Sequence, residues 1–290
     1  MIELSFATIA LLAVAGVGAG WLGAWIGIGG GIVLVPAFVL GFGLEPKVAV
    51  ATSLLTVIAT STAAGSVYVG RGQTNTRLAI ALEISTSAGG VLGGFVALAI
   101  PSHVLAGIFG VVMAATAVAM LRFSKVREAG DFQPSEQPAE GAEQPGSLAG
   151  TYYDEVRRGI VHYHPRRAAV GSAIALMAGA VSGLLGVGGG FLKVPAMNLG
   201  MDVPIKVAIA TSNFMIGVTA SASVFIYFGR DFVHPLLVAP VALGVVVGAL
   251  AGSLHSGKAK HASLKRVIAI VLVVVAIQMG LRAFGVNLGR

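Results

Sequence analysis

Cysteine is absent from this chain of 290 residues, and charged residues are scarce. Without cysteine there are no disulfides, no thiolate metal ligands and no thiol redox chemistry. Charged residues make up 11% of the sequence, less than half of the roughly 25% that is usual in soluble domains. The apolar runs also lack a nucleophile–base set or a group of metal ligands. We therefore expect neither an enzyme nor a metal or cofactor site.

Hydrophobic residues, by contrast, make up 56% of the chain. They form recurring apolar runs of about 20 residues, the length that crosses roughly 30 Å of hydrocarbon. A β-barrel would instead show alternating segments of about ten residues, so the sequence predicts an all-α polytopic membrane protein. The formal net charge is +7, but the basic residues lie at the ends of apolar runs. That placement favours a lipid bilayer as partner and not a nucleic acid.

The second half of the sequence repeats the first at an offset of 159 positions. Gly27-x-Gly-Gly-Gly31 returns as Gly186-x-Gly-Gly-Gly190, and the match continues without a gap. Between Gly27 and Ser53, 15 of 27 positions are identical to their partners. Shared hydrophobicity does not keep glycine, proline and lysine in register, so the chain is a duplicated unit.

The hydropathy pattern predicts the same helices in both halves. In the first half we expect helices at about 4–26, 31–43, 47–69, 77–100 and 103–121, the second of them short. In the second half we expect them at about 168–185, 190–200, 206–228, 233–254 and 265–284. The chain then divides into a first transmembrane repeat at 1–123, a flexible cytoplasmic linker at 124–166 and a second repeat at 167–290. The linker is rich in Pro, Glu, Gln and Gly, a composition that offers no hydrophobic core.

The basic residues predict the orientation of the helices. Clusters of basic residues on both sides of the linker and at Lys258–Arg266 predict that these segments lie on the cytoplasmic face of the membrane. Both segments are cytoplasmic if the long helix before each glycine break and the short helix after it form a pair that starts and ends on the same face of the membrane. Three further crossings then follow in each half, so the second repeat is inverted, as in many secondary transporters. The alternative is one broken helix per half with parallel repeats.

The triple glycines interrupt apolar runs, where a helix break is costly unless it lines a cavity or is buried in protein. Each break precedes a short helix, so its NH groups become helix N-terminal donors that suit an anion. The alternative is close helix packing, which we favour for Gly89-x-x-x-Gly93 and Gly248-x-x-x-Gly252. The repeated Thr-Ser pairs that follow each break could complete the shell of an anion, or could bond their own helix.

Lys193 is the one basic residue within either short helix, and an intramembrane charge suggests function. Snorkelling to the interface is its alternative. Glu83 is expected near a helix end, in contact with water, with a proton-carrying role as the less favoured alternative, and it is not included in the site. The predicted substrate-binding residues are Gly27, Gly29, Gly30, Gly31, Pro36, Thr52, Ser53, Gly186, Gly188, Gly189, Gly190, Lys193, Pro195, Thr211, Ser212 and Asn213.

Two copies of Gly-x-Gly-Gly-Gly-x-x-x-Val-Pro, each followed by Lys-x-Ala-x-Ala-Thr-Ser, resemble the TauE/SafE family of membrane transporters. The resemblance covers both repeats and implies a multi-pass secondary transporter of the bacterial inner membrane. Its expected substrate is sulfite or an organosulfonate such as sulfoacetate, moved outward. The alternatives are an anion channel and a transporter of an unrelated small metabolite. A homodimer is left open as an assembly.

Overall fold

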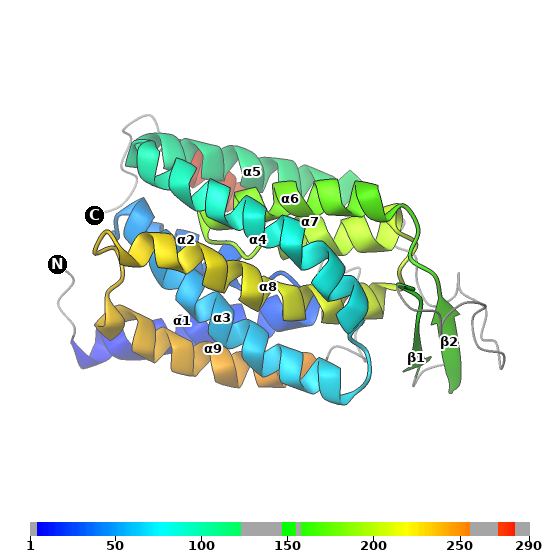
Figure 1. The fold of residues 1–290 in the computed structure, drawn as a ribbon. Helices are drawn as coiled ribbons and strands as arrows, with labels where there is room; N and C mark the ends of the chain where they lie inside the picture. The colour runs from blue at the N-terminus through cyan, green and yellow to red at the C-terminus, as the bar shows by residue number, and fades with distance from the viewer. Residues whose placement is uncertain (1–4, 123–146, 155–157, 256–271, 282–290) are drawn as a thin grey trace.

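The computed structural model describes residues 5–122, 147–154, 158–255 and 272–281, and they form a helical bundle with a small sheet at one end (Figure 1). The helices of the first half are α1 (Phe6–Ile26), α2 (Gly31–Pro36), the π-helix η1 (Ala37–Gly41), α3 (Pro46–Gly70), α4 (Thr76–Ala99) and α5 (Ser102–Arg122). Those of the second half are α6 (Ala168–Leu185), α7 (Gly190–Pro195), the π-helix η3 (Ala196–Gly200), α8 (Ile205–Phe228), α9 (Pro235–His255) and a shorter apolar helix at Leu272–Leu281. The predicted boundaries of α1 to α9 agree with these to within a few residues.

Six of these helices, α1, α3, α4, α6, α8 and α9, are long and apolar enough to span a bilayer. Large apolar side chains also point outward from the bundle: Ile84 on α4 is 75% exposed, and Leu243 on α9 is 73% exposed. Faces of this kind would be unfavourable in water and are suited to lipid. The described residues therefore form a multi-pass helical membrane protein.

Glycines bring helices from opposite halves of the chain into close contact. α1 packs against α9, and α4 packs against α6. A Cβ atom on the glycines at these crossings would collide with the backbone of the facing helix. Collisions of this kind occur at Gly16, Gly20, Gly244, Gly248 and Gly252 between α1 and α9, and at Gly89, Gly93, Gly179 and Gly183 between α4 and α6. The predicted packing role of Gly89, Gly93, Gly248 and Gly252 is confirmed.

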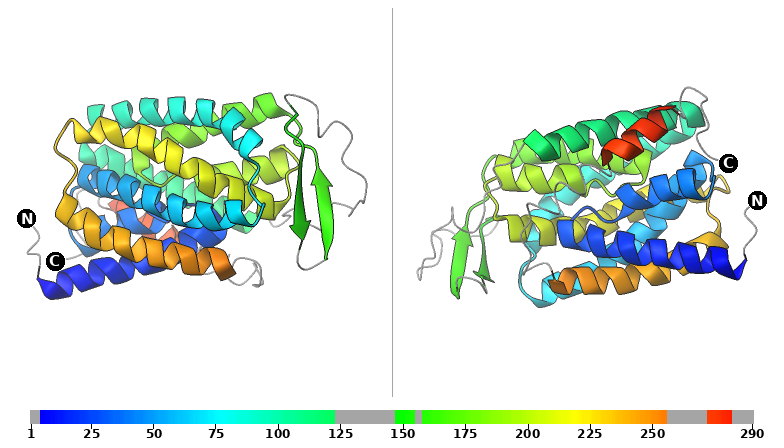
Figure 2. Two further views of the ribbon diagram at one scale, coloured as in Figure 1. Left: turned by 60° about the horizontal axis from the view of Figure 1, so that its bottom comes forward. Right: turned by 180° about the vertical axis from the view of Figure 1, so that it is seen from behind.

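Corresponding helices of the two halves run in opposite directions. In Figure 1 and in both views of Figure 2, α1 and α3 begin at the end of the bundle far from the sheet, whereas α6 and α8 begin at the end near it. α9 likewise runs opposite to α4. After each glycine break the chain turns back, so that α3 starts at the same end as α1, and α8 starts at the same end as α6.

The segment predicted to be a flexible linker contains a two-stranded antiparallel sheet, which the sequence analysis did not anticipate. Strand β1 (Gly150–Asp154) pairs with β2 (Gly159–Tyr163). Alternate side chains face the bundle: Tyr152, Val161 and Tyr163 are buried in the apolar cluster that contains Met201 and Val203. These apolar contacts order the strands where the polar composition of the preceding residues suggested none. Residues 124–146 and 155–157 of the predicted linker lie outside the described residues.

Candidate functional site

Each glycine break has a backbone that side chains disfavour. The residues concerned have φ angles in the left-handed region: 82° at Gly27, 80° at Gly29 and 77° at Gly30 in the first break, and 70° at Gly186, 82° at Gly188 and 69° at Gly189 in the second. Only glycine adopts such angles at little cost. The two breaks therefore share one backbone shape, as the sequence repeat predicts.

The breaks lie against each other in the interior, and two serines bond them together. Ser53 on α3 donates to the carbonyl oxygen of Gly186 over 2.7 Å. Ser212 on α8 donates to the carbonyl oxygen of Gly27 over 2.8 Å. Both serines are fully buried. Each hydroxyl thus bonds to the break of the other half. The alternative prediction, that the serines bond to the carbonyls of their own helix, does not describe these two bonds.

A pair of apolar side chains lies between the breaks. A Cβ atom on Gly29 would lie 2.9 Å from Ile216 Cγ2, and one on Gly188 would lie 2.8 Å from the same atom. Val57 Cγ1 is the next atom that both would meet. Val57 and Ile216 are fully buried and occupy equivalent positions of the repeat. The two breaks therefore converge on one point.

Two tyrosines that were not predicted as site residues fix the helix ends before the breaks. Tyr68 on α3 donates to the carbonyl oxygen of Ala24 over 2.9 Å, and Tyr227 on α8 donates to that of Gly183 over 2.7 Å. These carbonyls belong to the last turns of α1 and α6, which lack following helical NH partners. The tyrosines keep register in the repeat, which is the signal that could have identified them.

The remaining predicted hydroxyl and amide donors have different environments. Thr52 Oγ1 is buried and has no hydrogen-bond partner within the described chain. Thr211 Oγ1, its repeat partner, accepts from the backbone NH of Asn75 over 3.0 Å. Asn213 Nδ2 donates to the carbonyl oxygens of Ala24 and Ile209 over 3.0 and 3.1 Å. Of the four hydroxyls in the two Thr-Ser pairs, that of Thr52 is therefore the one without a hydrogen-bond partner in the described structure, and it is free to bond a ligand.

Pro36 and Pro195 end the α-helical part of the two short helices. Both have φ near −60°, and each is followed by five residues of π-helix. Proline has no NH to donate, so the regular α-helical ladder is interrupted there. The prolines shape the helices beyond the breaks. No described contact brings them to the meeting point of the breaks.

Lys193 belongs to a buried polar chain that crosses three helices. Its Nζ donates to Thr219 Oγ1 on α8 over 2.8 Å, and Thr219 donates to Glu83 Oε1 on α4 over 2.7 Å. Ser87 donates to the same carboxylate oxygen over 2.9 Å. Lys193 is 2% exposed and Glu83 is 9% exposed. Lys193 does not snorkel, and the expectation that Glu83 contacts water is wrong, because α4 places it against α8 in the interior.

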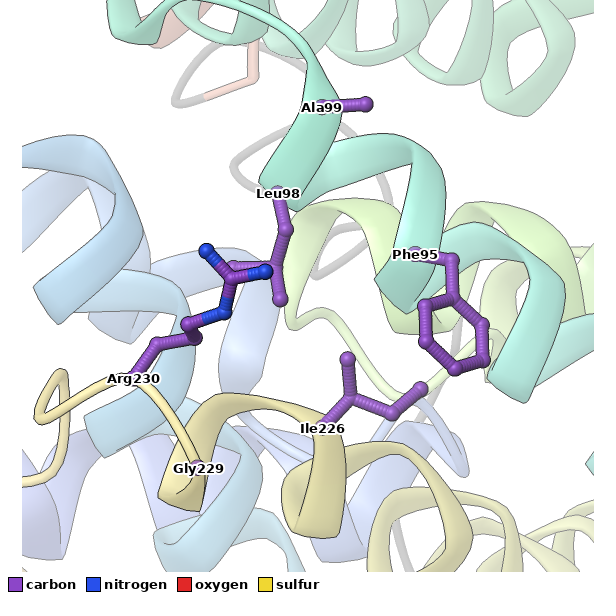
Figure 3. Close-up of a pocket in the computed structure, with 6 residues that line it drawn as sticks. All are labelled: Phe95, Leu98, Ala99, Ile226, Gly229 and Arg230. Atoms are coloured by element: carbon purple, nitrogen blue, oxygen red, sulfur yellow. The ribbon is translucent and has the colours of Figure 1, made fainter.

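A cavity of about 400 Å³ lies at the end of the bundle far from the sheet. It is lined by Phe95, Leu98 and Ala99 of α4 and by Ile226, Gly229 and Arg230 at the end of α8. Figure 3 shows the guanidinium of Arg230 beside Leu98. Lys47 Nζ donates to the carbonyl oxygen of Leu98 over 3.1 Å. Arg230 is therefore the cationic side chain among the residues that line this cavity, which was not predicted from the sequence.

The opposite end of the bundle is covered by the β1–β2 sheet. Asp154 is 1% exposed and forms an ion pair with Lys206, at the start of α8, over 2.9 Å. Asn75 Nδ2 donates to the carbonyl oxygen of Leu148 over 2.9 Å and to the hydroxyl oxygen of Tyr163 over 3.0 Å. Burial raises the pKa of Tyr163 to about 12, and the bond from Asn75 opposes this shift. The hydroxyl thus stays protonated at neutral pH.

This geometry defines a class: a multi-pass helical membrane protein with two interrupted helices that meet in its interior. The comparisons then specify the family. Residues 12–279 match the family described as Sulfite exporter TauE/SafE, and the chain belongs to this family of membrane transporters.

Named relatives agree with this assignment. The chain is 30% identical to the probable membrane transporter protein YunE of Bacillus subtilis (strain 168), over 93% of this chain and 96% of the relative. It is 27% identical to a probable membrane transporter protein of Xylella fastidiosa (strain 9a5c), over 87% of each. No solved structure matches the chain.

Proposed function

We propose that the protein is a secondary transporter that exports a small anion, sulfite or an organosulfonate such as sulfoacetate, across the bacterial inner membrane. The observation that carries the proposal is the buried ammonium of Lys193, which lies one turn after the second glycine break. Helical side chains lean toward the helix N-terminus. The NH groups of Leu192 and Lys193 bond to the carbonyl oxygen of Gly189, so the donors proposed for the anion are the NH groups of the break itself, together with the ammonium of Lys193.

We infer that the two halves are inverted repeats that provide alternating access to this site. The sequence duplication and the opposite directions of α1 and α6 support this inference. Inverted repeats with interrupted helices are common in secondary transporters, where substrate sites lie at the repeat interface. The serine bonds from each half to the break of the other half support a substrate site at that interface.

An anion that enters between the breaks requires Val57 and Ile216 to move apart, because both contact the glycines. In the described conformation the sheet covers one end of the bundle, and the cavity beside Arg230 lies at the other. We propose that anions exchange with water through that cavity, where Arg230 raises their local concentration.

The test is counterflow in proteoliposomes loaded with unlabelled anion. Labelled sulfite, sulfoacetate, thiosulfate and sulfate are offered outside, and a carrier accumulates the label of its own substrate transiently. Lys193→Met should abolish counterflow, whereas Lys47→Met, which removes a cation outside the proposed site, should keep it. A flux that does not saturate and shows no exchange would indicate a channel. Counterflow at wild-type affinity in Lys193→Met would refute the proposed site.

A further inference from the structure

We propose that Glu83 is a proton-binding site that couples proton movement to anion movement, with Lys193 as the cation paired in turn with the carboxylate and with the anion. This inference rests on the proposed function, because it assigns a coupling ion to the proposed anion site. It starts from a feature that anion binding alone leaves unexplained, a buried carboxylate in an anion transporter.

The carboxylate of Glu83 is only half satisfied. Its Oε1 accepts from Thr219 over 2.7 Å and from Ser87 over 2.9 Å. Its Oε2 is buried and has no hydrogen-bond partner among the described residues. A buried charged oxygen without a partner is costly. The bare oxygen is where a proton can add and neutralise the group without breaking either bond to Oε1.

The ammonium of Lys193 is linked to the carboxylate of Glu83 through the hydroxyl of Thr219. α4 packs against α6 and α8. α6 has no titratable side chain, and α8 has only Lys206 and Tyr227, which lie roughly 20 Å and 12 Å from Thr219 along the helix. Arg77, on α4 itself, lies roughly 9 Å along the helix from Glu83. The ammonium and the carboxylate therefore balance each other locally.

Charge neutrality then links the proton to the anion. With no anion bound, the positive Lys193 and the negative Glu83 sum to zero. A monovalent anion that binds beside Lys193 adds one negative charge in a medium where net charge is unfavourable. One proton taken from water by Glu83 Oε2 restores neutrality, and it returns to water when the anion leaves. The coupled movement is electroneutral, so the anion gradient and the pH gradient together set its direction.

The repeat provides an internal comparison. At the positions equivalent to Lys193 and Glu83, the first-half partner is Leu34 and the second-half partner is Ala242, while Thr219 corresponds to Thr60. The threonine is thus kept, and the two charges occur once. Because the equivalent helices α2 and α9 form with Leu34 and Ala242 at these positions, the fold does not require the charged pair.

The experiment follows protons and anions together in proteoliposomes that contain a trapped pH dye, with the membrane potential clamped. Methanesulfonate is the probe, because it stays ionised at every working pH and cannot itself carry the proton. Wild-type protein should move protons with methanesulfonate. Glu83→Gln should lose the proton movement and keep exchange of anion for anion. Glu45→Gln, which changes an exposed carboxylate bonded to Ser102, should behave as wild type.

Two further measurements keep the outcomes separate. The double variant Glu83→Ala/Lys193→Leu copies the residues at the repeat-equivalent positions, Ala242 and Leu34. It should therefore fold even where Glu83→Gln does not, and it should move no protons. Infrared difference spectra of the purified protein should show a carboxyl that gains a proton on addition of methanesulfonate or sulfite, absent in Glu83→Gln. Absence of counterflow with any sulfur anion in wild-type protein would refute the proposed function, whereas the infrared titration would still decide whether Glu83 takes up a proton as the pH falls. Proton movement at the wild-type ratio in Glu83→Gln, or no carboxyl signal that depends on Glu83, would overturn the coupling proposal.

Discussion

Adjacent residues Thr52 and Ser53 offer a sharp test of how the breaks are held. Both are fully buried, but Ser53 donates to Gly186 over 2.7 Å while the hydroxyl of Thr52 has no partner in the described chain. Ser53→Ala leaves the carbonyl of Gly186 without this donor, which should cost about 1–3 kcal/mol. For a chain of this size that corresponds to several degrees of melting temperature, at roughly 2–4 °C per kcal/mol. Ser212→Ala should cost the same, because its bond to Gly27 is the repeat equivalent.

Thr52→Val replaces a hydroxyl without a partner by a methyl group of similar size. It should leave the melting temperature unchanged or raise it, because an unpaired buried hydroxyl is unfavourable. If the Thr52 hydroxyl bonds the bound anion, affinity should fall roughly 10- to 150-fold, the equivalent of a bond to a charged group worth about 1.5–3 kcal/mol. Thermal unfolding and anion titration on the same purified samples measure both effects. A Ser53→Ala protein as stable as wild type, or a Thr52→Val protein that melts as early as Ser53→Ala, would refute this assignment.

Three other predictions follow from described contacts. Gly30→Ala should lower the melting temperature strongly, because φ is 77° and the new Cβ would lie 2.7 Å from a backbone oxygen of α1, whereas Gly18→Ala, with nothing within 4 Å, should be neutral. In intact cells, an impermeant thiol reagent should label a cysteine placed at His234 and should not label one at Arg158. His234 directly precedes α9, which begins at the end of the bundle far from the sheet, whereas Arg158 directly precedes β2 of the sheet, which is predicted to be cytoplasmic; the reverse pattern would invert the orientation. Asp154→Asn should loosen the sheet by weakening its ion pair over 2.9 Å, seen as faster proteolysis at the strands with an unchanged melting temperature of the bundle; equal proteolysis would show that apolar contacts alone hold the sheet.

The glycines of the breaks also have a packing role, which the sequence did not predict. Three glycines in a row suggested a purpose other than packing, because packing requires one glycine per turn. The structure shows that the same glycines also pack closely: a Cβ on Gly189 would lie 2.6 Å from the carbonyl oxygen of Ala178. A loss of anion binding in Gly30→Ala or Gly189→Ala therefore has to be read beside stability. The anion-binding role of the breaks stays a prediction.

The sequence alone determined the class of the protein, the positions of its helices and the two breaks. These properties are local: a run of about 20 apolar residues crosses a membrane wherever it lies in the chain, and a glycine needed for a left-handed backbone is kept in both copies of the repeat. The orientation of the helices in the membrane, which the basic residues predict to have the linker in the cytoplasm, stays a prediction.

Tertiary structure decided which polar groups meet. Ser53 and its acceptor are 133 residues apart, and Ser212 and its acceptor are 185 residues apart. Glu83 lies in α4, where helical periodicity gives no sign of its link through Thr219 to Lys193 of α7. The strands of the sheet are ordered by contacts with the bundle and not by their own composition. Hydrogen bonds between distant segments depend on how helices cross, and the crossing is set by the packing of the whole bundle.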